Sequence, residues 1–367
     1  MILFNWGDIV EAYKANKLPI NYSYSNNILN LLCDCIESYG EFKGYLRSME
    51  YDYKFVLENL FINDLYYSFK IDGCKIPKEY MFHFSYLNKT NEVIEFNNLK
   101  KALYLTLEDI SKNNFTLETI NKINKLLFYC CSKNSKTKCS GKLRNIQNFI
   151  LKPGIAGSSV SFIPPLHTEL NSFMKNLVEY INSNDELKII AVAITHYQFE
   201  KLHPYISGNG KIGRLLIPIQ FSFYKKEPPL LFLSEIFENL KNTYFTQLGT
   251  ENDESIEKFI LFFLQCVIDQ CNKNIKKIKK LNKIYKKDYE DFKTTIGGTT
   301  IYKVLPIMLR KVVFTTNDIV TEGKIHINSV NKVLNKLVDK GYLIKEKKKN
   351  TNRVTFCYKS IYDVYVN

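Results

Sequence analysis

The sequence predicts a mainly α-helical fold that is interrupted by one β-hairpin and ends in a small domain of three helices and two strands. Apolar residues recur at helical spacing through most of the 367 residues. Between residues 141 and 165, glycines and prolines instead surround two short runs that favour strands. After residue 299, three helical patterns are followed by two more such runs.

Length and composition describe an ordinary globular protein. Hydrophobic residues make up 45% and charged residues 24% of the chain, and the length predicts two or three domains at about 150 residues each. No run reaches the ~18 apolar residues of a membrane helix. The nine cysteines are odd in number, show no paired CxxC spacing, and follow no signal peptide. We therefore expect reduced thiols, a cytoplasmic location and no membrane contact.

Residues 1–100 are expected to form an N-terminal helical region. After a poorly defined lead-in, helical spacing begins at Ile28 and continues to about Leu65. Gly40 and Gly44 are expected to break this pattern.

Residues 101–272 are predicted to form a central helical domain. Its first helix, 117–131, begins after the N-cap Thr116. The strands 148–151 and 159–163 then flank a glycine-rich tip, and we expect an exposed flap because two strands are marginally stable alone. The helices that follow are predicted at 166–181, 187–199, 212–224 and 256–271.

Residues 273–298 predict a lysine-rich linker helix that ends at Gly297-Gly298, and residues 299–367 predict a separate domain. Three helices followed by a basic two-stranded ribbon are typical of a winged helix-turn-helix, whose third helix enters the major groove of DNA. The helices are expected at 301–312, 316–320 and 328–340, and the strands at 342–344 and 353–356.

The charge distribution favours DNA as a partner. The net charge is +14 and the pI about 9.1, with lysines concentrated in the linker and in the loop from Lys345 to Arg353. Solvated lysine-rich helix faces, or a winged helix that binds protein, are the alternatives. Because such domains usually have symmetric partners, we also expect a homodimer. The predicted groove contacts are Asn328, Asn331, Lys332 and Asn335.

The most informative segment runs from His203 to Arg214. His203 precedes a turn flanked by two glycines, which let a phosphate approach the backbone. A helix that begins near Asn209 would direct free N–H groups and its positive end at that phosphate. Lys211 and Arg214 share one helix face, and His203 can accept a proton at neutral pH. A purely structural turn with a capping histidine is the alternative.

This segment resembles the signature of Fic-domain proteins: His, Pro, Phe, any residue, Asp or Glu, Gly-Asn-Gly-Arg, any two residues, Arg. The resemblance covers roughly residues 55–272 and implies the Fic helical fold, with the hairpin as a flap that binds the target as an added strand. Further blocks resemble the family in the same order, at 141–148, 162–165, 196–200, 231–234 and 244–245.

Fic proteins typically transfer AMP from ATP to a hydroxyl of a protein Tyr, Ser or Thr. The resemblance therefore implies ATP as the substrate and a protein, or this chain itself, as the target. His203 would be the general base, Asn209 would orient a phosphate, and Tyr244 would contact the adenine. The implied nucleotide-binding residues are Gly208, Asn209, Gly210, Lys211, Ile212, Gly213, Arg214 and Tyr244.

Residues 68–73 resemble the self-inhibitory motif of the family: Ser or Thr, three residues, Glu, then Gly or Asn. In the family, that Glu pairs with the second motif Arg and keeps the γ-phosphate from its productive position. Ser68, Asp72 and Gly73 fill the motif here, and Arg214 would be the partner of Asp72. Asp72 is one methylene shorter than Glu, so we expect a looser pairing. Gly73 also suits a plain helix C-cap.

Ser207 departs from the family where a carboxylate normally binds Mg²⁺. A hydroxyl is a poor ligand for that ion, and Lys211 in place of Arg loses the two-pronged grip on phosphate. Three interpretations stay open: an AMP transferase with altered Mg²⁺ or Mn²⁺ dependence, a regulator that binds a nucleotide and DNA without turnover, and a transferase of another phosphate-containing group. His203 favours the first, because a protein without chemistry needs no base.

Overall fold

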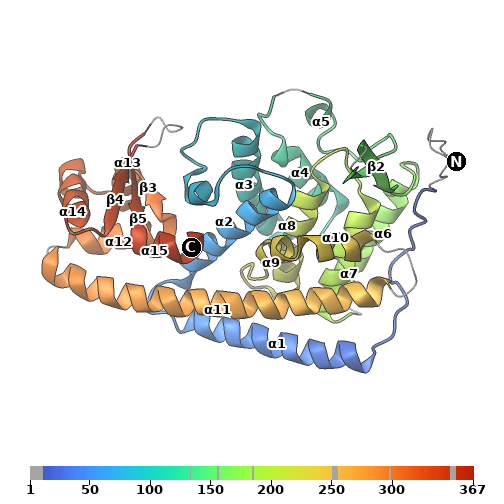
Figure 1. Ribbon diagram of the computed structural model, residues 1–367, viewed down its shortest axis with the longest axis horizontal. Coiled ribbons are helices and arrows are strands. Elements are labelled where there is room, and N and C mark those ends of the chain that lie inside the picture. The colour runs from blue at the N-terminus through green and yellow to red at the C-terminus, as the bar shows by residue number, and fades with distance from the viewer. Residues whose placement is uncertain are drawn as a thin grey trace.

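A computed structural model describes residues 11–132, 134–154, 157–183, 186–249, 255–296, 299–347 and 353–367. The longest element is α11 (Ser255–Thr295), which runs along one side of the molecule beneath both the helical body and the C-terminal domain (Figure 1). The predicted linker helix is therefore a direct continuation of the last helix of the central domain. It remains ordered because Ile275, Ile278 and Leu281 are buried.

The N-terminal region contains α1 (Asn26–Arg47), α2 (Tyr53–Ile71), the 3₁₀ helix η1 (Lys78–His83) and α3 (Asn91–Lys112). The breaks expected at Gly40 and Gly44 are wrong, since α1 passes through both positions. Glycine weakens a helix by about 1 kcal/mol, and this cost is offset because α1 buries an apolar face beside α11. The buried residues of that face are Ile28, Leu32, Cys35, Phe42 and Leu46.

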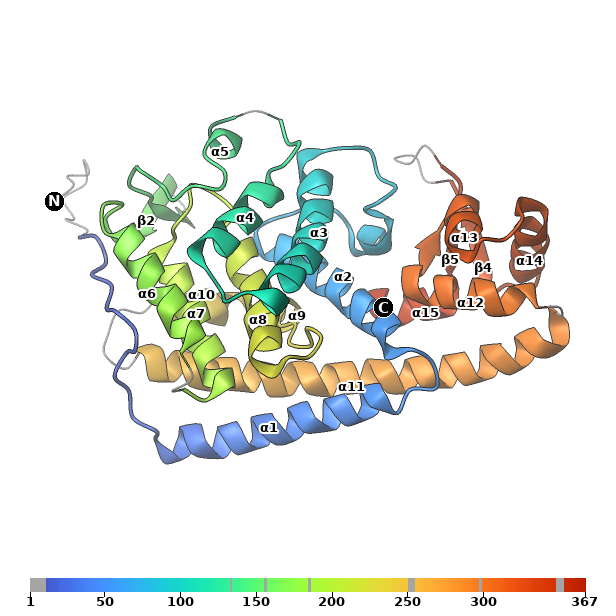
Figure 2. The same cartoon turned by 180° about the vertical axis from the view of Figure 1, so that it is seen from behind.

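The central region is a helical bundle with one hairpin. The helices α7 (Lys188–Leu202) and α8 (Asn209–Lys225) pack together at its centre, and both are buried on most sides. Around them lie α4 (Leu117–Leu127), α5 (Ser135–Lys138), α6 (Leu170–Asn182), α9 (Ser234–Asn239) and α10 (Lys241–Gly249) (Figure 2).

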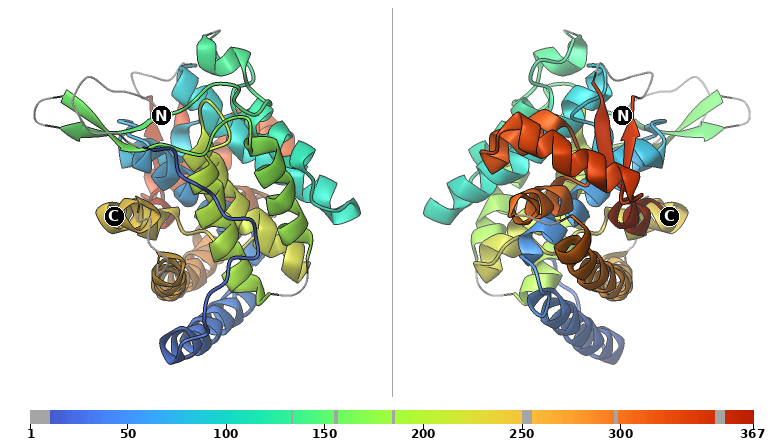
Figure 3. Two further views of the ribbon diagram at one scale, coloured as in Figure 1. Left: turned by 90° about the vertical axis from the view of Figure 1, so that its right-hand side faces the viewer. Right: turned by 90° about the vertical axis from the view of Figure 1, so that its left-hand side faces the viewer.

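The predicted hairpin is confirmed. Strands β1 (Ile150–Gly154) and β2 (Gly157–Phe162) pair antiparallel, with Gly154 opposite Gly157. The hairpin projects from the helical body (Figure 3), and among the described residues no third strand pairs with its two-stranded sheet.

The C-terminal domain has the winged-helix order of three helices followed by a two-stranded ribbon. A two-residue strand β3 (Val313–Phe314) adds to the ribbon in the order β3-β5-β4, and α15 (Lys359–Val366) closes the chain. Neither was expected from the sequence. The other elements are α12 (Thr300–Lys311), α13 (Thr316–Gly323), α14 (Ile327–Asp339), β4 (Leu343–Glu346) and β5 (Thr355–Tyr358). Part of the predicted basic wing, residues 348–352, lies outside the described residues.

Helix α2 joins the two parts of the molecule, because it packs against α12 of the C-terminal domain and against α8 and α9 of the body. None of the described helices is both long and apolar enough to cross a membrane.

Candidate active site

His203 ends α7 and lies directly before the turn that leads into α8. Its backbone is left-handed, with φ 45°, so the chain reverses sharply at this residue. Its Nδ1 atom is buried and has no hydrogen-bond partner among the described residues. The pKa of His203 is lowered to about 4: burial is the main cause and Arg144 adds to it, while the Glu200 backbone and Asp72 act in the opposite direction. The imidazole is therefore neutral at pH 7 and free to accept a proton.

The turn after His203 is fixed by the side chain of Asn209. Its Oδ1 accepts a hydrogen bond from the amide of Tyr205, and its Nδ2 donates to the carbonyl of the same residue, both at 2.8 Å. Asn209 is 2% exposed, and both ends of its amide are engaged. In this conformation Asn209 therefore shapes the turn, and both its side-chain oxygen and its side-chain nitrogen are bonded to the Tyr205 backbone.

The three motif glycines serve two purposes. Gly208 has φ 85°, and a Cβ there would lie 2.6 Å from a methyl carbon of Leu127. A Cβ on Gly210 would lie 2.8 Å from Nη1 of Arg214, and one on Gly213 would collide with the carboxylate of Glu200. Gly208 thus permits the turn, whereas Gly210 leaves room for the side chain of Arg214 and Gly213 for that of Glu200.

The N-terminus of α8 is suited to an anion. Its N-cap is Gly208, so no side chain caps the first N–H groups. Helix geometry leaves those groups without intrahelical acceptors, and the helix dipole favours negative charge there. Ile212, by contrast, is fully buried, so only its backbone is available for the predicted nucleotide contact.

Arg214 is held by the end of α2. Its Nε donates to the hydroxyl of Ser68 at 2.9 Å, and its Nη2 donates to the Ser68 carbonyl at 2.9 Å and to Asp72 Oδ1 at 2.7 Å. The Arg214 side chain is 2% exposed and that of Asp72 is 31% exposed. Burial alone would lower the pKa of Arg214, but the Asp72 carboxylate reverses this and raises it. Gly73 follows with φ 89°, a conformation suited to glycine.

Lys211 also has an acidic partner, which the sequence did not indicate. Its Nζ lies 2.7 Å from Oε2 of Glu95 in α3 and 4.3 Å from the centroid of the Phe69 ring. The two cations of the motif are therefore both paired with carboxylates from the N-terminal region.

Tyr244 is located in the aromatic core, where it is only 1% exposed. Its hydroxyl is 2.9 Å from Nε2 of His196, and the other ring nitrogen of His196 is 3.1 Å from the Gly213 carbonyl. Because that carbonyl can only accept, His196 Nδ1 donates to it and Nε2 accepts from Tyr244. This conformation leaves Tyr244 little surface for an adenine.

A residue without an assigned role in the sequence, Arg144, fastens the base of the flap to the motif. Its guanidinium is buried and donates to the carbonyls of His203 at 3.0 Å, Ile146 at 3.0 Å and Pro165 at 2.6 Å. Asn148 adds a bond of 2.9 Å to the Tyr205 carbonyl. These contacts hold the base of the flap next to the turn that follows His203.

The side chains of the motif do not fit a carboxylate-held metal ion. Ser207 supplies a hydroxyl, and its carbonyl is bonded to Asn124. Asp72 is engaged with Arg214, and burial raises the pKa of Glu200 to about 7, which favours its neutral form. Within the described ranges, no three His, Cys, Asp or Glu residues are grouped as a metal site would require.

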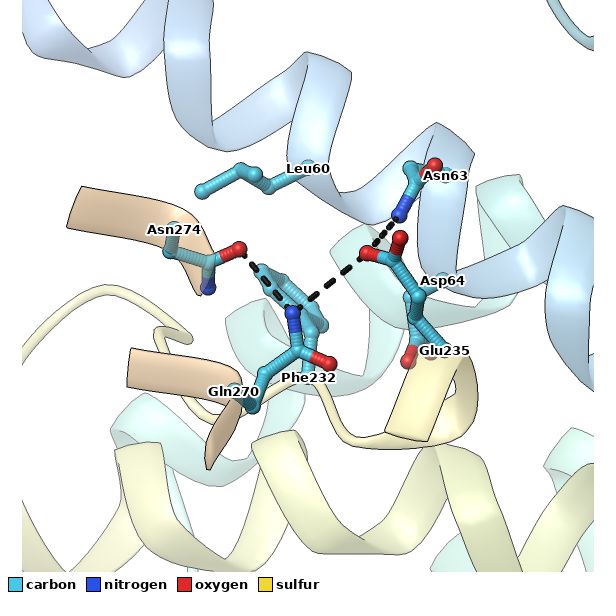
Figure 4. A pocket seen from close by; sticks show the side chains of 7 residues that line it. All are labelled: Leu60, Asn63, Asp64, Phe232, Glu235, Gln270 and Asn274. Atoms are coloured by element: carbon cyan, nitrogen blue, oxygen red, sulfur yellow. Dashed lines mark hydrogen bonds between the residues drawn. The ribbon is translucent and has the colours of Figure 1, made fainter. Parts of the chain in front are cut away.

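A second buried polar cluster lies away from the motif, between α2, α9 and α11 (Figure 4). Glu235 accepts from Asn63 at 2.8 Å and pairs with Lys277 at 2.5 Å and Lys273 at 2.8 Å. Burial alone would raise the pKa of Glu235, but the two lysines outweigh it and lower the pKa to about 2. This cluster fixes the middle of α2 and thereby the position of its Asp72 end.

Comparisons with known proteins agree with this geometry. Residues 114–220 match the Fic/DOC family, and residues 292–366 match the TFIIE alpha subunit family. A Fic family protein from Desulfovibrio desulfuricans shares the fold, with a TM-score of 0.57 and 16% identity over 93% of this chain and 98% of that one. The fold and the motif together define a Fic-fold protein with a C-terminal winged helix.

The relatives in sequence are named protein adenylyltransferase Fic. The Drosophila yakuba protein is 28% identical over 107 residues, which are 28% of this chain and 21% of that protein. The Aedes aegypti protein is 23% identical over 184 residues, which are 49% of this chain and 33% of that protein. Residues 114–220 are thus similar to the Fic/DOC family in sequence, and the chain spans about a third or less of these curated relatives.

Proposed function

We propose that the protein transfers AMP from ATP to a hydroxyl group of a protein side chain, with His203 as the general base. The observation that carries this proposal is the neutral His203, whose Nδ1 has no partner among the described residues and which lies just before the N-terminus of α8, where Gly208 provides no capping side chain. The imidazole takes the proton of the attacking hydroxyl. The hydroxyl oxygen then bonds to the α-phosphorus of ATP. The bond from that phosphorus to the oxygen bridging the α- and β-phosphates breaks, and pyrophosphate leaves.

The remaining residues bind and align. The first N–H groups of α8 would hold the phosphates, and Arg214 would join them after exchanging Asp72 for a phosphate. That exchange keeps the buried Arg214 guanidinium paired with a negative charge. Opening the ion pair without a phosphate would leave the guanidinium buried and unpaired, which is costly. The flap would take the target segment along a free strand edge. Asp72 is thus an inhibitory residue in this proposal.

The proposal is tested by incubating the protein with ATP labelled at the α- or the γ-phosphate. We expect protein-bound label from α-labelled ATP alone, lost in His203→Ala and retained in His167→Ala, which replaces an exposed histidine. Label from γ-labelled ATP would instead indicate transfer of another group. Nucleotide binding with no label under any condition would favour a regulator without turnover.

We further propose that the winged helix binds DNA through α14. Its apolar residues Val330, Val333, Leu334 and Leu337 are buried, which leaves the opposite face exposed. That face carries the predicted groove contacts Asn328, Asn331, Lys332 and Asn335.

Binding to duplex DNA, measured by fluorescence anisotropy, should weaken steeply with salt, because neutralised phosphates release counterions. Lys332→Ala should weaken DNA binding and reduce the slope of affinity against salt concentration on logarithmic axes. A flat salt dependence would support a winged helix that binds protein. Sedimentation equilibrium is a separate measurement, which would show whether the protein forms the expected homodimer.

A further inference from the structure

The ion pair between Lys211 and Glu95 joins the motif to a helix outside it. Their side chains are only 16% and 15% exposed, so water screens this pair weakly. Phe69, in the last turn of α2, covers the ammonium group on another side. Lys211 therefore has two partners, and neither belongs to the motif segment itself.

An incoming polyphosphate needs the same ammonium group. In the described part of the chain, each motif cation already has a carboxylate: Asp72 for Arg214 and Glu95 for Lys211. Asp72 follows α2, whereas Glu95 lies in α3, so the two acids are carried by different helices. Displacing one does not by itself release the other.

We propose that Glu95 is a second carboxylate that restricts nucleotide entry, because it must release Lys211 before that lysine can bind a phosphate. This inference rests on the proposed nucleotide site. Since Lys211 would contact the polyphosphate, Glu95 acts against ATP more than against AMP. Glu95 thereby determines how strongly the nucleotide affinity of the site depends on the number of phosphates.

The test compares nucleotide affinities of the full chain by calorimetry, with α,β-methylene ATP as the non-reacting probe. Glu95→Gln keeps the shape of the side chain and removes its charge, so we expect the dissociation constant to fall about fivefold or more, with little change for AMP. Glu92→Gln is the matched control, because Glu92 is an exposed acid in the same helix, three residues earlier.

A double-mutant cycle decides whether the effect passes through Lys211. Glu95→Gln should have no effect on ATP affinity in the Lys211→Gln background. Unchanged affinity for ATP in Glu95→Gln, or an equal gain in both backgrounds, overturns the inference. If Glu95→Gln fails to fold, Glu95→Asp loosens the same pair and must still tighten ATP binding.

The variant Asp72→Gly distinguishes a failure of the inference about Glu95 from a failure of the proposed function. If Asp72→Gly binds and is labelled by ATP while Glu95→Gln behaves as the parent, only the inference about Glu95 fails. If no variant binds ATP, the proposed nucleotide site itself is wrong.

Discussion

Asn59 of α2 donates a hydrogen bond of 2.9 Å to the carbonyl oxygen of Leu309 in α12, 250 residues away in the chain. The bond is buried and connects the body to the winged-helix domain. The same helix carries Ser68 in its last turn and ends at Asp72, both bonded to Arg214. One rigid helix thus reaches from the C-terminal domain to the motif.

Loss of this bond should weaken the attachment of the two parts. Asn59→Ala leaves the buried Leu309 carbonyl without its partner, so we expect the free energy of unfolding to fall by about 1–3 kcal/mol. Urea denaturation followed by circular dichroism measures the change. Asn30→Ala, on the exposed face of α1, is the control and should leave stability nearly unchanged. Equal stability of both variants would contradict the role of the bond.

Removal of the Asp72 carboxylate should activate the protein. Asp72→Gly frees Arg214 for a phosphate, and we expect labelling by α-labelled ATP to rise about tenfold, within the usual range of coupling between sites. Asp72→Glu keeps the negative charge and should remain close to the parent. A rate in Asp72→Gly no higher than in the parent would count against inhibition by this residue.

The proposed base, His203, should remain unprotonated and able to accept a proton in mildly acidic solution. His203 has a pKa of about 4 in the folded protein, against about 6.5 when unperturbed, so labelling should show no inflection near pH 6.5. Arg144 and Asp72 are the charged groups that act on it, and Glu200, with a pKa of about 7, titrates nearby. Glu200→Gln removes that second titration, and an inflection near pH 6.5 in this variant would refute the shift.

The same shift makes stability depend on pH. Because the folded pKa of His203 lies below the unfolded one, its contribution is complete above about pH 6.5 and is lost as the pH falls toward 4. Comparing unfolding free energies of the parent and His203→Gln across this window checks the sign.

Restoring a carboxylate at position 207 should restore metal dependence. Ser207→Asp supplies the hard oxygen ligand that Mg²⁺ prefers, and we expect its labelling rate with Mg²⁺ to exceed the parent's by about tenfold or more. Ser207→Asn matches the size without the charge and should show no such gain. A chelator should abolish the gain, and a gain that survives chelation would show that the metal is not responsible.

Two glycine substitutions should have opposite effects on stability. Gly208→Ala places a Cβ against Leu127 at a position with φ 85°, so we expect a loss of about 1–3 kcal/mol. Gly40→Ala lies within α1 with open space around it, and should stabilise the protein by about 0.5–1 kcal/mol. Thermal unfolding of the two variants distinguishes the cases, and similar melting temperatures would contradict the geometry of the motif turn.

The sequence by itself determined the elements that depend on local chemistry. The hairpin follows from glycines and β-favouring residues between residues 141 and 165, and the start of α8 near Asn209 follows from the glycine turn. The winged-helix order follows in the same way from helical spacing and the basic ribbon. Each of these signals lies within a few residues of the structure that it specifies.

The tertiary structure decided what depends on partners distant in the chain. It showed that α1 passes through Gly40 and Gly44, because burial against α11 outweighs the helix propensity of two glycines. It assigned the amide of Asn209 to the turn and paired Lys211 with Glu95, 116 residues away. Charge pairing depends on the distance in space between two side chains. Residue types and spacing within one segment do not give that distance when the partners lie far apart in the chain.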